Sequence, residues 1–173
     1  KVLCPGLRVA WIAATKEVID RYVIIKQSTD LQTSNFNQML IYRYLKANDF
    51  EARLKLIRDT YRPRRDAMVA ALEEELPAGM TFTRPAGGMF LWLELPQGVD
   101  AHSLLQRCLA AQVAFVPGFA FFPENGKRNT ARLNFSNLPP EKIRFGVHVF
   151  ARCLAEEMAA NAAQGSPALA ARD

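Results

Sequence analysis

Residues 84–96, RPAGGMFLWLELP, decide the fold of the second half of the chain. The proline and the glycine pair form a turn signal, and the apolar run after them is typical of a strand. The preceding residues 80–84, MTFTR, alternate between apolar and polar side chains, as a half-buried strand does. We therefore expect two strands joined by a tight turn.

Both helices and strands are expected downstream of this hairpin. The expected elements are a helix over 100–110 with Asp100 as its N-cap, strands over 113–118 and 131–136, and a helix that starts near Pro139 and Pro140. In the strand 131–136, Arg132 shares a face with Asn134, while Leu133 and Phe135 lie on the opposite face. The second half is thus predicted to be a mixed α/β unit.

The first half of the chain is mostly helical in pattern. Residues 8–14, RVAWIAA, predict a buried strand, and a helix capped by Thr15 and another capped by Ser34 are expected after it. The helical pattern from residue 50 onward contains Pro63, where we expect a bend and a domain junction. A lone strand cannot bury both faces of a parallel sheet, so we expect the chain to be the C-terminal part of something longer.

Composition excludes several classes of protein. The chain has 173 residues, half of them apolar, and a net charge of +5. No apolar run approaches the roughly 18 residues of a membrane helix. The three cysteines and two histidines lack the spacing of a disulfide framework or a metal site, and the basic residues lack the pattern of a nucleic-acid site. A cytoplasmic protein without a metal, a membrane contact or a nucleic-acid contact through this part of the chain is expected.

A family resemblance rests on separate segments that follow one another in order. The segments are KVLCPGLRVAWIAATKEVID (1–20), YRPRRDAM (61–68), RPAGGMFLWLELP (84–96), VAFVPGFAFF (113–122) and RLNFSN (132–137). Together they resemble the C-terminal portion of class I/II aminotransferases, the fold-type-I enzymes that use pyridoxal 5'-phosphate. The branch most resembled contains 2-aminoadipate, kynurenine and multi-substrate aminotransferases.

This resemblance implies an α/β fold-type-I architecture with parts of two domains. Residues 1–62 would be the end of the large cofactor-binding domain, residues 63–160 the small domain that closes over the substrate, and residues 161–173 a disordered tail. The implied reaction is a ping-pong, Schiff-base transfer of an amino group from an amino acid to a 2-oxo acid, in a homodimer. The alternative is the aminotransferase-like effector domain of a winged-helix transcription regulator, which shares the lysine and the phosphate arginine.

Three residues carry the implied chemistry. By resemblance, Lys1 is the Schiff-base lysine, Arg8 binds the cofactor phosphate, and Arg132 binds the α-carboxylate of the substrate. The residue types suit these roles, because a neutral amine can attack an aldehyde and a planar guanidinium matches phosphate or carboxylate oxygens. The alternatives are a solvated terminal lysine, a surface arginine at position 8, and a structural ion pair between Arg132 and an acid such as Glu94.

Overall fold

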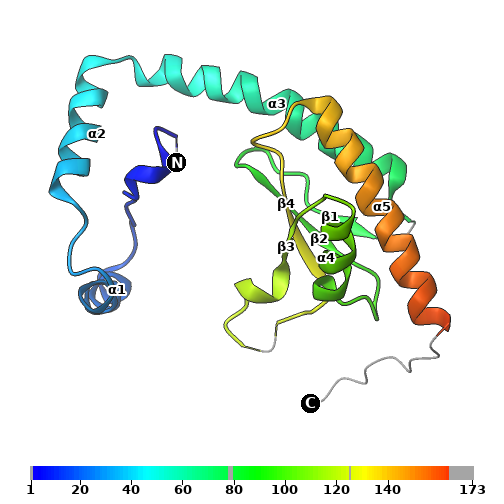
Figure 1. The fold of residues 1–173 in the computed structure, drawn as a ribbon. Helices are drawn as coiled ribbons and strands as arrows, with labels where there is room; N and C mark the ends of the chain where they lie inside the picture. Colours follow the sequence, from blue (N-terminus) through cyan, green and yellow to red (C-terminus); the bar gives the residue numbers. More distant parts are fainter. Residues whose placement is uncertain (1, 78–79, 125, 164–173) are drawn as a thin grey trace. The chain divides into compact units, whose positions relative to one another are not determined.

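The structure is a computed structural model that describes residues 2–77, 80–124 and 126–163. The chain forms two compact units, residues 1–58 and residues 59–173, and each is described by itself. Helix α3 (Phe50–Glu75) begins in the first unit and ends in the second (Figure 1). None of the described helices is long and apolar enough to cross a membrane.

The second unit contains a four-stranded antiparallel sheet. Its spatial order is β1 (Thr81–Phe82), β2 (Phe90–Glu94), β4 (Thr130–Asn134) and β3 (Val116–Pro117). In the central pair, Leu91 lies opposite Leu133, and Trp92 lies opposite Arg132. The sequence therefore predicted all four strands correctly.

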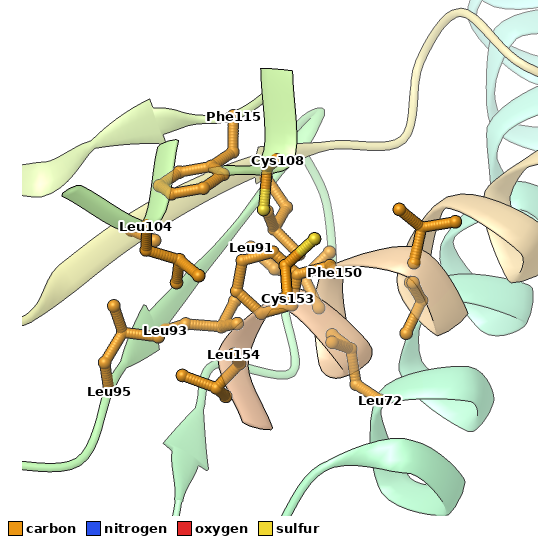
Figure 2. Close-up of a cluster of buried hydrophobic side chains, with 14 of the residues drawn as sticks. Leu72, Leu91, Leu93, Leu95, Leu104, Cys108, Phe115, Phe150, Cys153 and Leu154 are labelled. Atoms are coloured by element: carbon orange, nitrogen blue, oxygen red, sulfur yellow. The ribbon is translucent and has the colours of Figure 1, made fainter. Parts of the chain in front are cut away.

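The two faces of this sheet have different environments. Leucines 91, 93 and 133 point into a core that also receives buried side chains from α3, α4 (Ala101–Ala110) and α5 (Pro140–Ala163). Figure 2 shows Leu72, Leu104 and Phe150 meeting the leucines of β2 in this core. The opposite face, called here the Arg132 face, carries Phe90, Trp92, Arg132 and Asn134. Each leucine buried in the core contributes roughly 1.5–3 kcal/mol, which is why the alternation fixes the register.

Local sequence signals explain where these elements begin. Gly88 has a φ of +82°, a value that side chains rarely tolerate, so the turn before β2 depends on glycine. The Asp100 carboxylate accepts a hydrogen bond from the His102 amide at 2.7 Å and caps α4 as predicted. It also pairs with the Arg128 guanidinium, whose Nε lies 2.7 Å away. Burial raises the pKa of Asp100, but the Arg128 and His102 hydrogen bonds and the Arg128 charge outweigh burial and lower this pKa overall.

The described residues of the first unit form helices and connecting segments, and none of these residues is buried. Helices α1 (Lys16–Thr29) and α2 (Asn35–Ala47) follow a 3₁₀ turn, η1 (Pro5–Leu7), and contain no buried residue. Ser34 caps α2 as predicted, because its Oγ accepts from the Asn37 amide at 3.3 Å. Thr15 occupies the N-cap position of α1 but makes no side-chain cap bond.

The strand expected over residues 8–14 was wrong. These residues form no regular element, and Trp11 is 86% exposed. A strand is stabilised by a ladder of hydrogen bonds to a neighbouring strand, and the described part of the first unit contains no strand to provide one.

Two long helices cover the expected domain junction and the start of the expected tail. Helix α3 continues through Pro63 as one helix, whereas the compact units divide after Arg58. Helix α5 extends to Ala163, so the first residues of the expected tail are helical. Residues 164–173, where the rest of that tail was expected, lie outside the described residues.

Candidate functional site

Of the predicted site residues, Lys1 lies outside the described part of the chain. Arg8 belongs to the first unit and Arg132 to the second. The roles that the resemblance assigns to these three residues stay predictions.

Arg8 follows the 3₁₀ turn η1 in a left-handed backbone conformation. Its φ is 52° and ψ is 36°, and its amide donates to the Pro5 carbonyl at 3.3 Å. Helix α2 supports the turn, because the Asn37 side-chain amide donates to the Leu7 carbonyl at 3.0 Å. Left-handed backbone costs a non-glycine residue roughly 1–3 kcal/mol and is found often at ligand sites. The exposed Arg8 side chain has no ion-pair partner among the described residues.

Arg132 projects from the middle of the Arg132 face without an acidic partner in the described chain. Its Cζ lies 4.1 Å from the ring centroid of Phe90 and 4.2 Å from that of Phe121. Its Nε is buried and has no hydrogen-bond partner among the residues that the structure describes. The alternative of an Arg132–Glu94 pair was wrong, because the Glu94 carboxylate instead accepts from the Lys127 ammonium at 2.8 Å.

Several other arginines already have partners within the described chain, which distinguishes them from Arg8 and Arg132. Arg84 pairs with Glu73, with 2.8 Å between Nη2 and Oε1, and Arg128 pairs with Asp100. Arg64 donates to the Ser136 carbonyl, and Arg65 pairs with Asp66 at 2.6 Å. These contacts are structural. Free guanidinium groups on a protein surface fit anionic ligands, and paired ones do not.

The comparison with known families decides the identity of the chain. The family model described as "Aminotransferase class I and II" matches residues 2–150. The chain belongs to the class I and II aminotransferase family.

Individual relatives of this class I and II aminotransferase chain support the branch that the sequence indicated. It is 45% identical over 158 residues to an aromatic-amino-acid aminotransferase of Thermococcus litoralis, covering 91% of this chain and 38% of that protein. It superposes with a TM-score of 0.78 and 44% identity on an alpha-aminoadipate aminotransferase of Thermus thermophilus, complexed with N-(5'-phosphopyridoxyl)-L-leucine. That match covers 92% of this chain and 41% of the other, so both relatives are much longer than this chain. The architecture is therefore part of a fold-type-I α/β transferase.

A regulator also resembles this aminotransferase chain, at lower identity. The HTH-type transcriptional regulator YisV of Bacillus subtilis, which is described as uncharacterised, is 32% identical over 136 residues. The match covers 79% of this chain and 28% of the regulator. The two aminotransferases named above are more similar to this chain, at 45% and 44% identity.

The sequence did not identify the aromatic residues around Arg132 in this aminotransferase chain. Phe90 and Trp92 could have been found, because period-two alternation places them on the face that carries Arg132 in the neighbouring strand. Phe121 gave no such signal, since it comes from the 3₁₀ helix η2 (Gly118–Phe121). Its contact with Arg132 depends on tertiary folding alone.

Gly118 lies at a point of close packing between η2 and the sheet. Its φ is not in the left-handed region, but a Cβ there would lie 2.1 Å from Thr130 Oγ1 and 2.7 Å from Trp92 Cη2. Glycine is required because η2 packs directly on the sheet. Because glycine has no side chain, η2 can lie close to the sheet, and Phe121 therefore reaches Arg132.

Proposed function

We propose that this chain is the C-terminal part of a pyridoxal 5'-phosphate-dependent aminotransferase, which transfers an amino group from an amino acid to a 2-oxo acid in a ping-pong reaction. The observation that carries the proposal is Arg132, a cation held between two rings and left without an acidic partner in the described chain. Such a group suits a ligand carboxylate. The 45% identity to an aromatic-amino-acid aminotransferase supports this choice of reaction.

Arg8 fits the cofactor phosphate. Its guanidinium is exposed, and the strained backbone and the Asn37 contact fix the point from which it projects. A guanidinium donates two parallel hydrogen bonds to phosphate oxygens, which a lysine cannot do. When bound, the cofactor supplies an aldehyde carbon and an electron-withdrawing ring. Arg8 would anchor that molecule and orient it.

Lys1 would bind the cofactor covalently and then move a proton. Its amine must be neutral to act as a nucleophile and as a base, so its pKa must fall below the value of about 10.4 found in free peptides. The positive charge of Arg8 would lower that pKa. Once the amino group of the substrate has taken its place on the cofactor, the free Lys1 amine would accept the proton from the substrate α-carbon and return it to the product.

Arg132 would bind the α-carboxylate that amino acids and 2-oxo acids share. The Nε atom of Arg132 is closed off within the fold, whereas its two terminal nitrogens, Nη1 and Nη2, are not buried in this way. A carboxylate therefore binds the two terminal nitrogens end-on. Because one group serves both substrates, the same site works in both halves of the ping-pong cycle.

We assign residues 1–62 to the large cofactor domain and residues 63–160 to the small domain. We also propose a homodimer in the cytoplasm. The support for further contacts is the exposed apolar surface of the first unit, where Ile24 is 62% exposed and Phe36 is 76% exposed. A second subunit and the rest of the large domain would bury these side chains.

The decisive experiment on the mechanism replaces Lys1 in the full-length protein. Lys1→Ala is expected to abolish the cofactor absorbance band of the bound lysine and to lower turnover by several orders of magnitude. Lys16→Ala is the control, because Lys16 forms an exposed ion pair with Asp20 at 2.6 Å. Wild-type turnover by Lys1→Ala would remove the proposed mechanism. Wild-type absorbance without any transamination by the unmodified protein would support the regulator instead.

A further inference from the structure

The Arg132 guanidinium is enclosed by aromatic rings from two different elements. Phe90 belongs to β2 and Phe121 to η2, and each ring centroid lies close to 4 Å from Cζ, at 4.1 Å and 4.2 Å respectively. At these distances a cation is attracted to the face of a ring. Two rings at this distance restrict the positions that the guanidinium can take.

The second ring is itself held in place by the sheet. Trp92 and Phe121 form a T-shaped pair, with 5.8 Å between ring centroids and 73° between the planes. Trp92 also contacts Gly118 closely enough that a Cβ there would lie 2.7 Å from its ring. Helix η2 is therefore fixed on the Arg132 face at both of its ends, and Phe121 cannot move away without disturbing Trp92.

No polar contact in the described chain performs the same task for Arg132. Its guanidinium forms no ion pair, and its buried Nε has no acceptor. Arginine side chains elsewhere in the second unit, such as Arg84 and Arg128, are oriented by carboxylates. A carboxylate beside Arg132 would compete with the substrate, whereas an aromatic ring restricts the guanidinium and leaves its terminal nitrogens free.

We propose that Phe90 and Phe121 are positioning residues, which hold the Arg132 guanidinium in the orientation that receives the substrate α-carboxylate. This inference rests on the proposed function of Arg132. A free arginine side chain loses rotamer freedom when it binds a ligand, and that loss weakens binding. The rings impose the restriction during folding, so the substrate meets an arginine that is already ordered.

The expected effect is on affinity and not on turnover. Loss of one ring should weaken carboxylate binding by about 3- to 10-fold, the factor expected from immobilising one flexible side chain. The KM values for the amino acid and the 2-oxo acid should rise by the same factor. The rate constant kcat should change by less than about twofold, because neither ring touches the reacting atoms in this account.

The experiment uses the full-length holoenzyme with Phe90→Leu, Phe121→Leu and Phe121→Tyr. Leucine keeps an apolar side chain but removes the ring, and tyrosine keeps the ring. Phe119→Leu is the matched control, since Phe119 lies in the same 3₁₀ helix and its ring lies under Arg128, which Asp100 already neutralises. The readouts are KM, kcat, the melting temperature and the Kd of a monocarboxylate without an amino group, measured by calorimetry.

A substrate without a carboxylate separates positioning from general loosening of the fold. Half-reaction rates are measured for an amino acid and for a primary amine that lacks the carboxylate. The leucine variants of Phe90 and Phe121 should weaken only the amino acid reaction, and Phe121→Tyr should restore it. Equal losses for the amine, or an equal loss in Phe119→Leu, would overturn the proposal.

Arg132→Ala distinguishes failure of this inference from failure of the proposed function. If Arg132→Ala weakens monocarboxylate binding strongly while both leucine variants bind like wild type, the positioning role is wrong and the carboxylate role stands. If Arg132→Ala also binds like wild type, the carboxylate role is wrong, and the positioning role fails with it.

Discussion

Replacing Gly118 by alanine tests how η2 is attached to the sheet. An alanine Cβ would lie 2.1 Å from Thr130 Oγ1, 2.8 Å from Thr130 Cβ and 2.7 Å from Trp92 Cη2. Carbon atoms pack at about 3.5–4.0 Å, so these atoms must separate by about 1 Å or more. Neither neighbour moves easily, because Thr130 is 2% exposed in a central strand and its hydroxyl donates to the Lys127 carbonyl.

We expect Gly118→Ala to lower the free energy of unfolding by about 1–3 kcal/mol, the range for overpacking a well-packed site. The assay is urea denaturation of the full-length protein followed by circular dichroism. Displacement of η2 should also weaken substrate binding through Phe121. Gly87→Ala is the control, since its added Cβ would meet nothing within 4 Å, and its stability should change by less than about 0.5 kcal/mol. If Gly118→Ala unfolds at the wild-type urea concentration, the close packing is wrong.

Other substitutions test the core and its charges. Gly146→Ala places a Cβ in open space inside α5 and should stabilise the protein by about 0.5–1 kcal/mol, measured as a higher urea midpoint. Glu157, which is 5% exposed, accepts hydrogen bonds from Ser103 and Arg107, so Glu157→Ala should cost about 2 kcal/mol in the same assay. Because the pKa of Asp100 is lowered from 3.8, its ionised form adds stability that is complete above that pH and is lost as the pH falls through the folded value. Asp100→Asn should therefore lower the melting temperature at pH 7 by the equivalent of less than about 1 kcal/mol, and the difference from wild type should shrink below pH 4. A constant difference across this pH range would contradict the lowered pKa.

The sequence was most informative where a residue's environment follows from its neighbours along the chain. The alternation in residues 90–94 and 131–135 predicted which face of β2 and β4 lies in the core. Leu91 and Leu133 are buried on that face, whereas Trp92 and Arg132 lie on the opposite face and are not buried. Side-chain caps at Ser34 and Asp100 were equally predictable, because each bond spans only two or three residues. These features need no knowledge of the rest of the fold.

The sequence did not predict features that depend on a contact with a residue far away along the chain. Residues 8–14 have the apolar character of a strand, but strand formation requires a neighbour that the described first unit lacks. Phe121 reaches Arg132 only because Gly118 permits close packing of η2, and no local pattern reports that contact. Only the structure shows that Arg132 has no acidic partner among the described residues. Glu94 lies on the neighbouring strand, but its carboxylate pairs with Lys127.

The KM of the full-length holoenzyme for its amino acid substrate tests the central claim, that Arg132 binds the α-carboxylate. Arg132→Ala is expected to raise this KM by at least about 30-fold, because loss of one partner of a desolvated charge pair costs about 2–5 kcal/mol. Arg84→Ala, which removes an arginine that is 62% exposed and paired with Glu73, should leave it within about twofold. An unchanged KM in Arg132→Ala would contradict the account.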